Sequence, residues 1–83
     1  MNYEAKAGTD VVIETDILYG DSPTLMFYDD VLLLGTYDGK LSSTGTWLFT
    51  IPAEDTANKE GLYWYCIYEV ENKPCFKQPI YFK

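Results

Sequence analysis

Apolar and polar residues alternate along most of this chain, and clusters of turn-forming residues interrupt the alternation about every 8 to 12 positions. Alternation with a period of two is typical of strands that place one face on a hydrophobic core. The segments that carry it are residues 11–18, 24–28, 31–37, 46–51, 62–70 and 75–82. The pattern predicts an all-β fold, either a two-sheet antiparallel sandwich or a small barrel.

The connections between these segments carry their own signals. Asp38-Gly39 predicts a tight hairpin, and Asp29-Asp30 predicts a turn between two strands. Residues 52–61 do not alternate; acidic residues come early in this segment, Lys59 comes late and Gly61 ends it. We therefore predict one short helical turn near residues 53–60.

The length of 83 residues is enough for one domain with a modest core, so we expect a single domain over residues 1–83. Aromatic residues make up 17% of the chain, a content that argues against disorder. The residues expected to face the core are Ile13, Ile17, Leu25, Phe27, Trp47, Phe49, Ile51, Tyr63, Tyr65, Ile67, Phe76, Ile80 and Phe82.

The charge balance excludes several classes of function. The chain has no His and no Arg, and its net charge is −7. Without His it lacks the usual general base, the common catalytic triads and the common His metal sites. A strongly negative field opposes contact with nucleic acid or an anionic membrane. Asp29-Asp30 is an adjacent pair that does not converge on one substrate, so we predict no enzyme activity, no cofactor and no metal.

Two features address the compartment. No apolar run of about 18 residues is present, and residues 1–10 lack the apolar core of a signal peptide, so we expect synthesis in the cytoplasm and no membrane contact. A tight turn centred on residues 72–73 would pair Cys66 with Pro79 and would leave Cys75 out of register with Cys66. We therefore expect two free thiols and a reducing compartment of synthesis.

The order of these segments resembles an immunoglobulin-like domain over roughly residues 7–82. The stretches that carry the resemblance are residues 8–15 (GTDVVIET), 27–30 (FYDD), 47–51 (WLFTI) and 55–65, the last of which is similar to the family's Asp…Gly-x-Tyr-x-Cys stretch. The resemblance implies a two-sheet antiparallel sandwich in which Tyr63 is the corner tyrosine, its hydroxyl bonded to nearby backbone. A fibronectin-III-like sandwich is the rival arrangement.

The chain departs from the family pattern at the core disulfide, because Thr15 and Tyr65 occupy the two cysteine positions and Cys66 comes one residue later. A short immunoglobulin-like chain without that disulfide is similar to phage virion accessory proteins, including capsid decoration and tail or baseplate components. The resemblance therefore implies a non-enzymatic structural module, incorporated in a virion, whose partner is a capsid or tail protein or a second copy of itself.

By the same resemblance, the strands that contain Phe27, Tyr65 and Ile80 are neighbours in one sheet. The outward residues of these strands are Met26, Tyr28, Trp64, Cys66, Tyr68 and Tyr81. A solvated sheet face is usually polar, whereas this one is aromatic. We predict a partner-binding face formed by Met26, Tyr28, Trp64, Tyr68 and Tyr81. The alternatives are that the chain's own loops cover these rings, or that the rings only reflect β-propensity.

Two other readings concern the ends and edges of the sandwich. Acidic residues gather at the turns expected at one end, where they form a solvated surface or, alternatively, a Ca²⁺ site: Asp10, Asp29, Asp30, Glu54, Asp55 and Glu60. This charge supports a second functional hypothesis, an acidic phage or mobile-element inhibitor that imitates nucleic acid to occupy a host protein. A third hypothesis is that residues 76–82 add as an edge strand to another sheet, unless Pro79 blocks the pairing.

Overall fold

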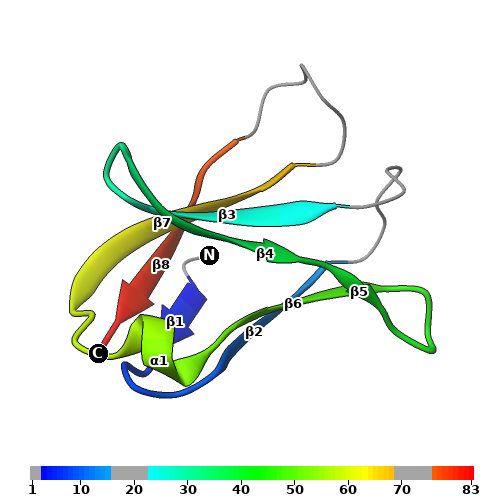
Figure 1. Cartoon of the computed structure of the whole chain (residues 1–83), viewed down its shortest axis with the longest axis horizontal. Helices are drawn as coiled ribbons and strands as arrows, with labels where there is room; N and C mark the ends of the chain where they lie inside the picture. The colour runs from blue at the N-terminus through cyan, green and yellow to red at the C-terminus, as the bar shows by residue number, and fades with distance from the viewer. Residues whose placement is uncertain (1–2, 16–22, 69–75) are drawn as a thin grey trace.

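The computed structural model describes residues 3–15, 23–68 and 76–83. Its elements are strands β1 (Tyr3–Ala5), β2 (Val11–Thr15), β3 (Thr24–Asp29), β4 (Leu32–Asp38), β5 (Lys40–Leu41) and β6 (Trp47–Ile51), helix α1 (Ala53–Thr56), and strands β7 (Gly61–Tyr68) and β8 (Gln78–Phe82) (Figure 1). The short helix lies where residues 53–60 were predicted to form one helical turn, so that prediction is confirmed. Within the described ranges, no helix has the length and apolarity needed to cross a membrane.

The strands form two sheets, one with the order β1-β8-β7-β3-β4 and the other with the order β2-β6-β5. β1 runs parallel to β8, and every other pairing among the described strands is antiparallel. The strands that hold Phe27, Tyr65 and Ile80 are neighbours, as expected. The fold is an all-β, immunoglobulin-like two-sheet sandwich. Its smaller sheet corresponds to the B, E and D strands of that architecture, and the larger sheet contains those named G, F, C and C′.

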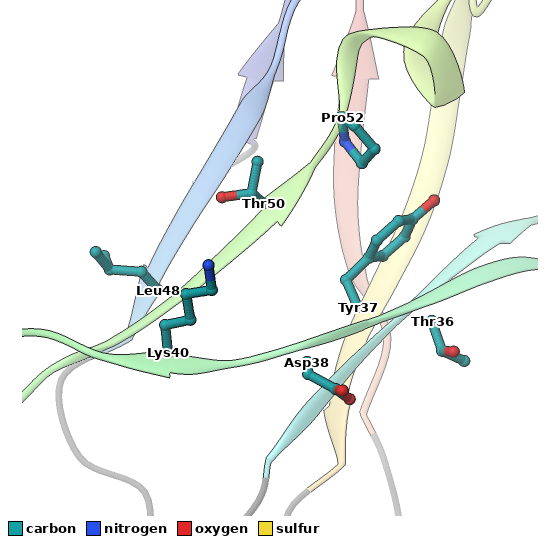
Figure 2. Close-up of a pocket in the computed structure, with 7 residues that line it drawn as sticks. All are labelled: Thr36, Tyr37, Asp38, Lys40, Leu48, Thr50 and Pro52. Carbon is teal, nitrogen blue, oxygen red and sulfur yellow. The ribbon is translucent and has the colours of Figure 1, made fainter.

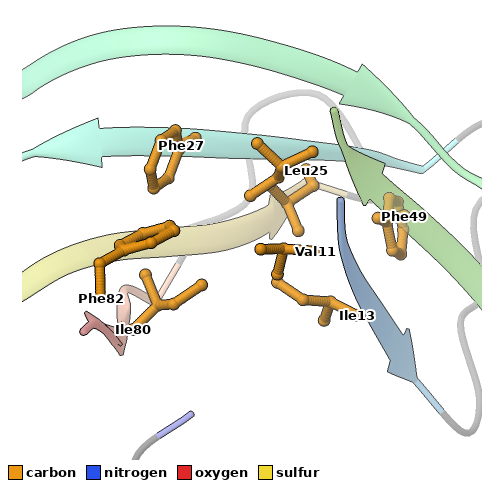
Figure 3. Close-up of a cluster of buried hydrophobic side chains, with 8 residues drawn as sticks. Val11, Ile13, Leu25, Phe27, Phe49, Ile80 and Phe82 are labelled. Atoms are coloured by element: carbon orange, nitrogen blue, oxygen red, sulfur yellow. The ribbon is translucent and has the colours of Figure 1, made fainter. Parts of the chain in front are cut away.

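The core lies between the sheets and follows the predicted alternation. Its buried members are Val11, Ile13, Leu25, Phe27, Phe49, Ile51, Ile80 and Phe82 (Figure 3). Tyr63, Tyr65, Ile67 and Trp47 pack against this cluster, which confirms that they face inward. The prediction was wrong for Phe76, which is 77% exposed, because β8 begins only at Gln78. Ile17 lies outside the described residues.

Tyr63 joins the core through its ring. The ring centroid lies 5.6 Å from that of Phe27 and 5.4 Å from that of Phe82, the latter pair edge-on at 89°. Within the described part of the chain, the Tyr63 hydroxyl makes no hydrogen bond to the preceding turn, so the expected corner bond is not observed. Aromatic pairs in this geometry add to the free energy gained from burial.

A buried threonine holds the corner helix against the turn that joins β1 to β2. The Thr56 hydroxyl donates a hydrogen bond to the carbonyl of Thr9 at 2.7 Å and accepts one from the N–H of Gly8 at 3.1 Å. Asp10 completes the junction, because its carboxylate accepts a hydrogen bond from the N–H of Ala53 at 2.7 Å. These bonds hold α1 next to the turn before β2 and the start of β7. We call this region the acidic corner, and its acidic residues are Asp10, Glu54, Asp55 and Glu60.

The two predicted turns have different outcomes. Asp29-Asp30 forms the turn of the β3–β4 hairpin, with Asp30 at a φ of 54°. Asp38-Gly39 is not a hairpin, because β4 and β5 belong to different sheets and Gly39 is where the chain crosses between them. A Cβ atom at Gly39 would lie 2.8 Å from the ring of Phe49, so close packing explains this glycine.

The last strand is not at an edge, which overturns the hypothesis that residues 76–82 form an adaptor strand. β8 has β7 on one side and β1 on the other (Figure 1). Among the strands that the structure describes, those at the edges of the two sheets are β1 and β4, and β2 and β5. Any added strand must therefore pair at one of those four.

Candidate functional site

The register of the larger sheet brings the predicted partner-binding residues to one side of the sandwich. We call this side the outer face, and its aromatic and apolar members, with Cys66, are Met26, Tyr28, Leu33, Leu62, Trp64, Cys66, Tyr68, Pro79 and Tyr81. Its polar members, which lie toward its ends and its β4 edge, are Glu4, Thr24, Thr36 and Asp38. Its central row crosses four strands and consists of Leu33, Tyr28, Trp64 and Pro79. Aromatic and apolar side chains are therefore neighbours across the sheet, as well as along each strand.

The predicted residues do not form one compact cluster. Tyr28 lies opposite Trp64 at the centre, whereas Tyr68 pairs with Thr24 near one end of β7 and Tyr81 pairs with Leu62 near the other end. Leu62 and Tyr68 are six residue steps apart along the extended β7, a distance of about 20 Å. The most accessible part of the outer face is the Leu62–Tyr81 pair, with exposed fractions of 48% and 47%.

The chain itself covers part of this face. The Nζ atom of Lys77 lies 4.1 Å from the centroid of the Tyr28 ring, and it also donates a hydrogen bond to the carbonyl of Asp30 at 3.0 Å. Because β7 lies between β8 and β3, the Lys77 side chain must reach across β7 to make these contacts. The alternative reading, that the chain covers its own rings, therefore holds for Tyr28, which is half-buried.

Cys66 lies at the middle of the outer face, opposite Met26, and is buried. It is disulfide-bonded, so the prediction of two free thiols is wrong. The prediction assumed a tight turn that pairs Cys66 with Pro79, whereas the observed register pairs Trp64 with Pro79. Cys75, the other cysteine of the chain, lies outside the described residues.

The acidic corner is used partly for structure. The Tyr37 hydroxyl donates a hydrogen bond to the carboxylate of Asp55 at 2.9 Å and thereby ties β4 to α1. Burial raises the pKa of Tyr37 well above its ordinary value, and the hydrogen bond to Asp55 raises that pKa further. Across the described ranges, no group of three or more His, Cys, Asp or Glu side chains is placed to hold a metal ion. The Ca²⁺ alternative therefore gains no support from these residues.

A cleft of about 380 Å³ lies next to Tyr37, where β4 passes beside β6 (Figure 2). It is lined by Thr36, Tyr37, Asp38, Lys40, Leu48, Thr50 and Pro52. β4 supplies one wall and β6 supplies the other, because the chain leaves the larger sheet at Gly39 (Figure 2). Sequence reasoning missed this cleft, since it interpreted the crossing at Gly39 as a hairpin.

Sequence reasoning also missed an aliphatic surface at the β3–β4 hairpin. Val31 is 81% exposed and Leu32 is 62% exposed, and Leu33 and Leu34 are exposed as well. A signal for it was present, because four consecutive apolar residues cannot all face the core of a strand with a period of two. Leu34 is the extra residue of a β-bulge, since Phe27 pairs with Gly35 and the next residue of β3 pairs with Leu33.

The outer face carries residue types that are common at protein interfaces. Tryptophan, tyrosine and methionine are enriched in the buried centres of protein interfaces, and the outer face carries all three.

A comparison with known proteins identifies no relative: no protein family, curated protein or solved structure matches this chain.

Proposed function

We propose that this protein is a non-enzymatic interaction module that docks through its outer face onto a larger protein assembly. The observation that carries the proposal is the apolar outer face with its accessible Leu62–Tyr81 pair. A sheet face in contact with water alone would carry mostly polar side chains. The proposed partner-binding residues are Met26, Tyr28, Trp64, Tyr68 and Tyr81, together with Leu62 beside Tyr81; Lys77 covers part of Tyr28.

The assembly that we propose is a phage virion. Two features support it: the resemblance of the sequence to immunoglobulin-like virion accessory proteins, and the immunoglobulin-like sandwich itself. In such a particle the module would decorate the capsid or belong to the tail or baseplate. Fold alone does not fix function, so the proposal needs a test on particles.

The test uses purified virus particles from the genome that encodes the chain, with mass spectrometry to detect the protein in them. Wild type should be present, whereas a Leu62→Ser, Tyr81→Ser double variant should bind at least about tenfold more weakly, since the few side chains that dominate an interface each cost above about 1 kcal/mol when they are truncated. Both side chains are half-exposed. We therefore expect the free energy of unfolding of the variant to lie within about 0.5 kcal/mol of the wild-type value.

Val12→Ser is the matched control, because Val12 is 47% exposed but belongs to the smaller sheet. It should be incorporated like wild type. Absence of the wild-type protein from purified particles would contradict the virion assignment. Equal binding by the folded double variant would contradict docking through the outer face.

The alternative function, an acidic inhibitor that occupies a host nucleic-acid-binding protein, is supported by the net charge of −7. Charge mimicry weakens as salt screens it, whereas apolar docking depends little on salt. Substitution of Asp29, Asp30 and Glu54 by their amides would therefore abolish binding by such an inhibitor and leave docking through the outer face unchanged.

A further inference from the structure

β4 differs from the other edge strands of the sandwich. It spans seven residues, whereas β1 spans three, β2 five and β5 two. A long edge strand offers backbone N–H and C=O groups to an additional strand, and proteins usually protect such edges with lysine, proline or short length. β4 has no lysine or proline between Leu32 and Asp38, and its first three residues are exposed leucines.

The bulge at Leu34 is the one protective feature within β4. It interrupts the edge near the hairpin and leaves the regular stretch from Gly35 to Asp38. The 380 Å³ cleft opens beside that stretch, between β4 and β6 (Figure 2). The cleft has space for a side chain of a strand that is added beside Gly35 to Asp38. The end of that strand nearer the hairpin would contact the exposed leucines, Leu32 to Leu34.

The charges around the edge indicate what kind of strand would fit. Carboxylates lie at both ends of β4, on Asp29 and Asp30 at the hairpin and on Asp38 at the crossing. The cations nearby are Lys40 in the cleft and Lys77, whose ammonium group bonds to the backbone of Asp30. Negative charge therefore exceeds positive charge along this edge, as it does over the whole molecule.

This charge opposes a second copy as the occupant, because two molecules of net charge −7 would repel each other. We infer that the free edge of β4 binds an extended segment of another protein, aliphatic along its centre and carrying Lys or Arg at its ends. The segment adds to the larger sheet beside β4, with backbone hydrogen bonds for affinity and side chains for specificity. This inference does not rest on the proposed function, because β3 separates β4 from β7, which carries Leu62, and Tyr81 lies one strand further on in β8.

The experiment uses the whole chain and a synthetic peptide of the length of β4, with alternating Val and Thr, a Lys at each end and blocked termini. Hydrogen–deuterium exchange should slow at the amides of β4 when the peptide is added. Binding should weaken as salt rises, because the ends of the peptide are attracted by carboxylates. Leu32→Lys should weaken binding at least tenfold, and Asp30→Asn should reduce the salt dependence.

Three controls separate the possible results. Both substituted positions are exposed, and asparagine tolerates the positive φ at Asp30, so both variants should fold. A peptide with N-methylated alternate residues lacks the donors for strand pairing and should not bind. The Leu62→Ser, Tyr81→Ser variant should bind the peptide like wild type.

Four results would overturn the inference. They are unchanged exchange at β4 at millimolar peptide, equal binding of the N-methylated peptide, equal binding by the folded Leu32→Lys variant, and protection of β4 by self-association without peptide. Failure of the virion test leaves this experiment unaffected, so the two proposals can fail separately.

Discussion

Thr56 shows how a single residue of ordinary chemistry can hold a corner of the fold. Among the described residues, Thr56 is the polar one that is fully buried. Its hydroxyl joins α1 to the turn before β2 through hydrogen bonds to Gly8 and Thr9. A buried polar group without such partners costs free energy. The alternation of the strands gives no hint of this role, because Thr56 belongs to the helix.

Replacement of Thr56 by valine should lower the free energy of unfolding by about 1–3 kcal/mol, because the carbonyl of Thr9 would lose its buried donor. Urea denaturation monitored by tryptophan fluorescence would measure the change. Thr50→Val is the control, since Thr50 is exposed on β6, and it should change stability by less than about 0.5 kcal/mol. A Thr56→Val protein as stable as wild type would refute the structural role assigned to this hydroxyl.

Single residues also show where the prediction of the core was correct and where it was wrong. Phe82 and Phe76 lie on the same predicted strand with the same parity, yet Phe82 is buried and Phe76 is exposed. Parity is a local property that holds only where the chain is extended and paired, and β8 begins after Phe76. The sequence could not locate that start, because the pairing partners of β8 lie elsewhere in the chain.

Among the elements, β4 and α1 are joined across the open side of the sandwich by Tyr37. The hydroxyl bonds to Asp55, and the ring lies against Gly35, where a Cβ atom would approach the hydroxyl oxygen to 2.7 Å. Glycine at position 35 thus makes room for the tyrosine that reaches the corner. The sequence resemblance assigned a corner hydrogen bond to Tyr63, whereas Tyr37 makes a bond to this corner from a different strand.

The raised pKa of Tyr37 predicts how stability depends on pH. The protonated tyrosine is favoured in the folded state, so its contribution is complete below the unfolded pKa of about 10 and is lost as pH rises above it. The difference in unfolding free energy between wild type and Tyr37→Phe should be constant from about pH 7 to 9 and should fall at higher pH. Chemical denaturation over that range measures it, and a difference that stays constant beyond pH 10 would contradict the prediction.

Element positions were largely predictable from the alternation, whereas the correct neighbours β3, β7 and β8 came from the family resemblance. The alternation located strands at β2, β3, β4, β6, β7 and β8, and the charge order located α1. It did not predict β1, which is three residues long and pairs with the far end of the chain. Strand pairing depends on segments distant in sequence, and no local pattern encodes it.

At the scale of the whole molecule, the disulfide at Cys66 stabilises the fold mainly by its effect on the unfolded chain. A cross-link reduces the conformational entropy of the unfolded state and so stabilises the folded one. The chain has a modest core, so a contribution of that kind is a large share of its stability. The protein is therefore cross-linked at Cys66, whereas the sequence led us to expect free thiols.

Cys66→Ala should lower the free energy of unfolding by about 2–4 kcal/mol. Wild type treated with reductant should lose a similar amount, and the variant should not respond to reductant. Thiol titration of the untreated, denatured wild type should find no reactive thiol at Cys66. A reactive thiol there, or a wild type whose unfolding midpoint ignores reductant, would contradict the bond.

The sequence by itself determined the side of each strand on which a side chain lies wherever the chain is extended and paired, because alternation along a strand assigns each residue to one side; Phe76, which precedes β8, is the exception. It also determined the charge, through a composition without arginine or histidine. Only the tertiary structure decided that β8 is covered, that β4 keeps a free edge, that Lys77 lies over Tyr28 and that Cys66 is bonded. These features depend on which distant segments meet, and that is settled by the packing of the whole chain.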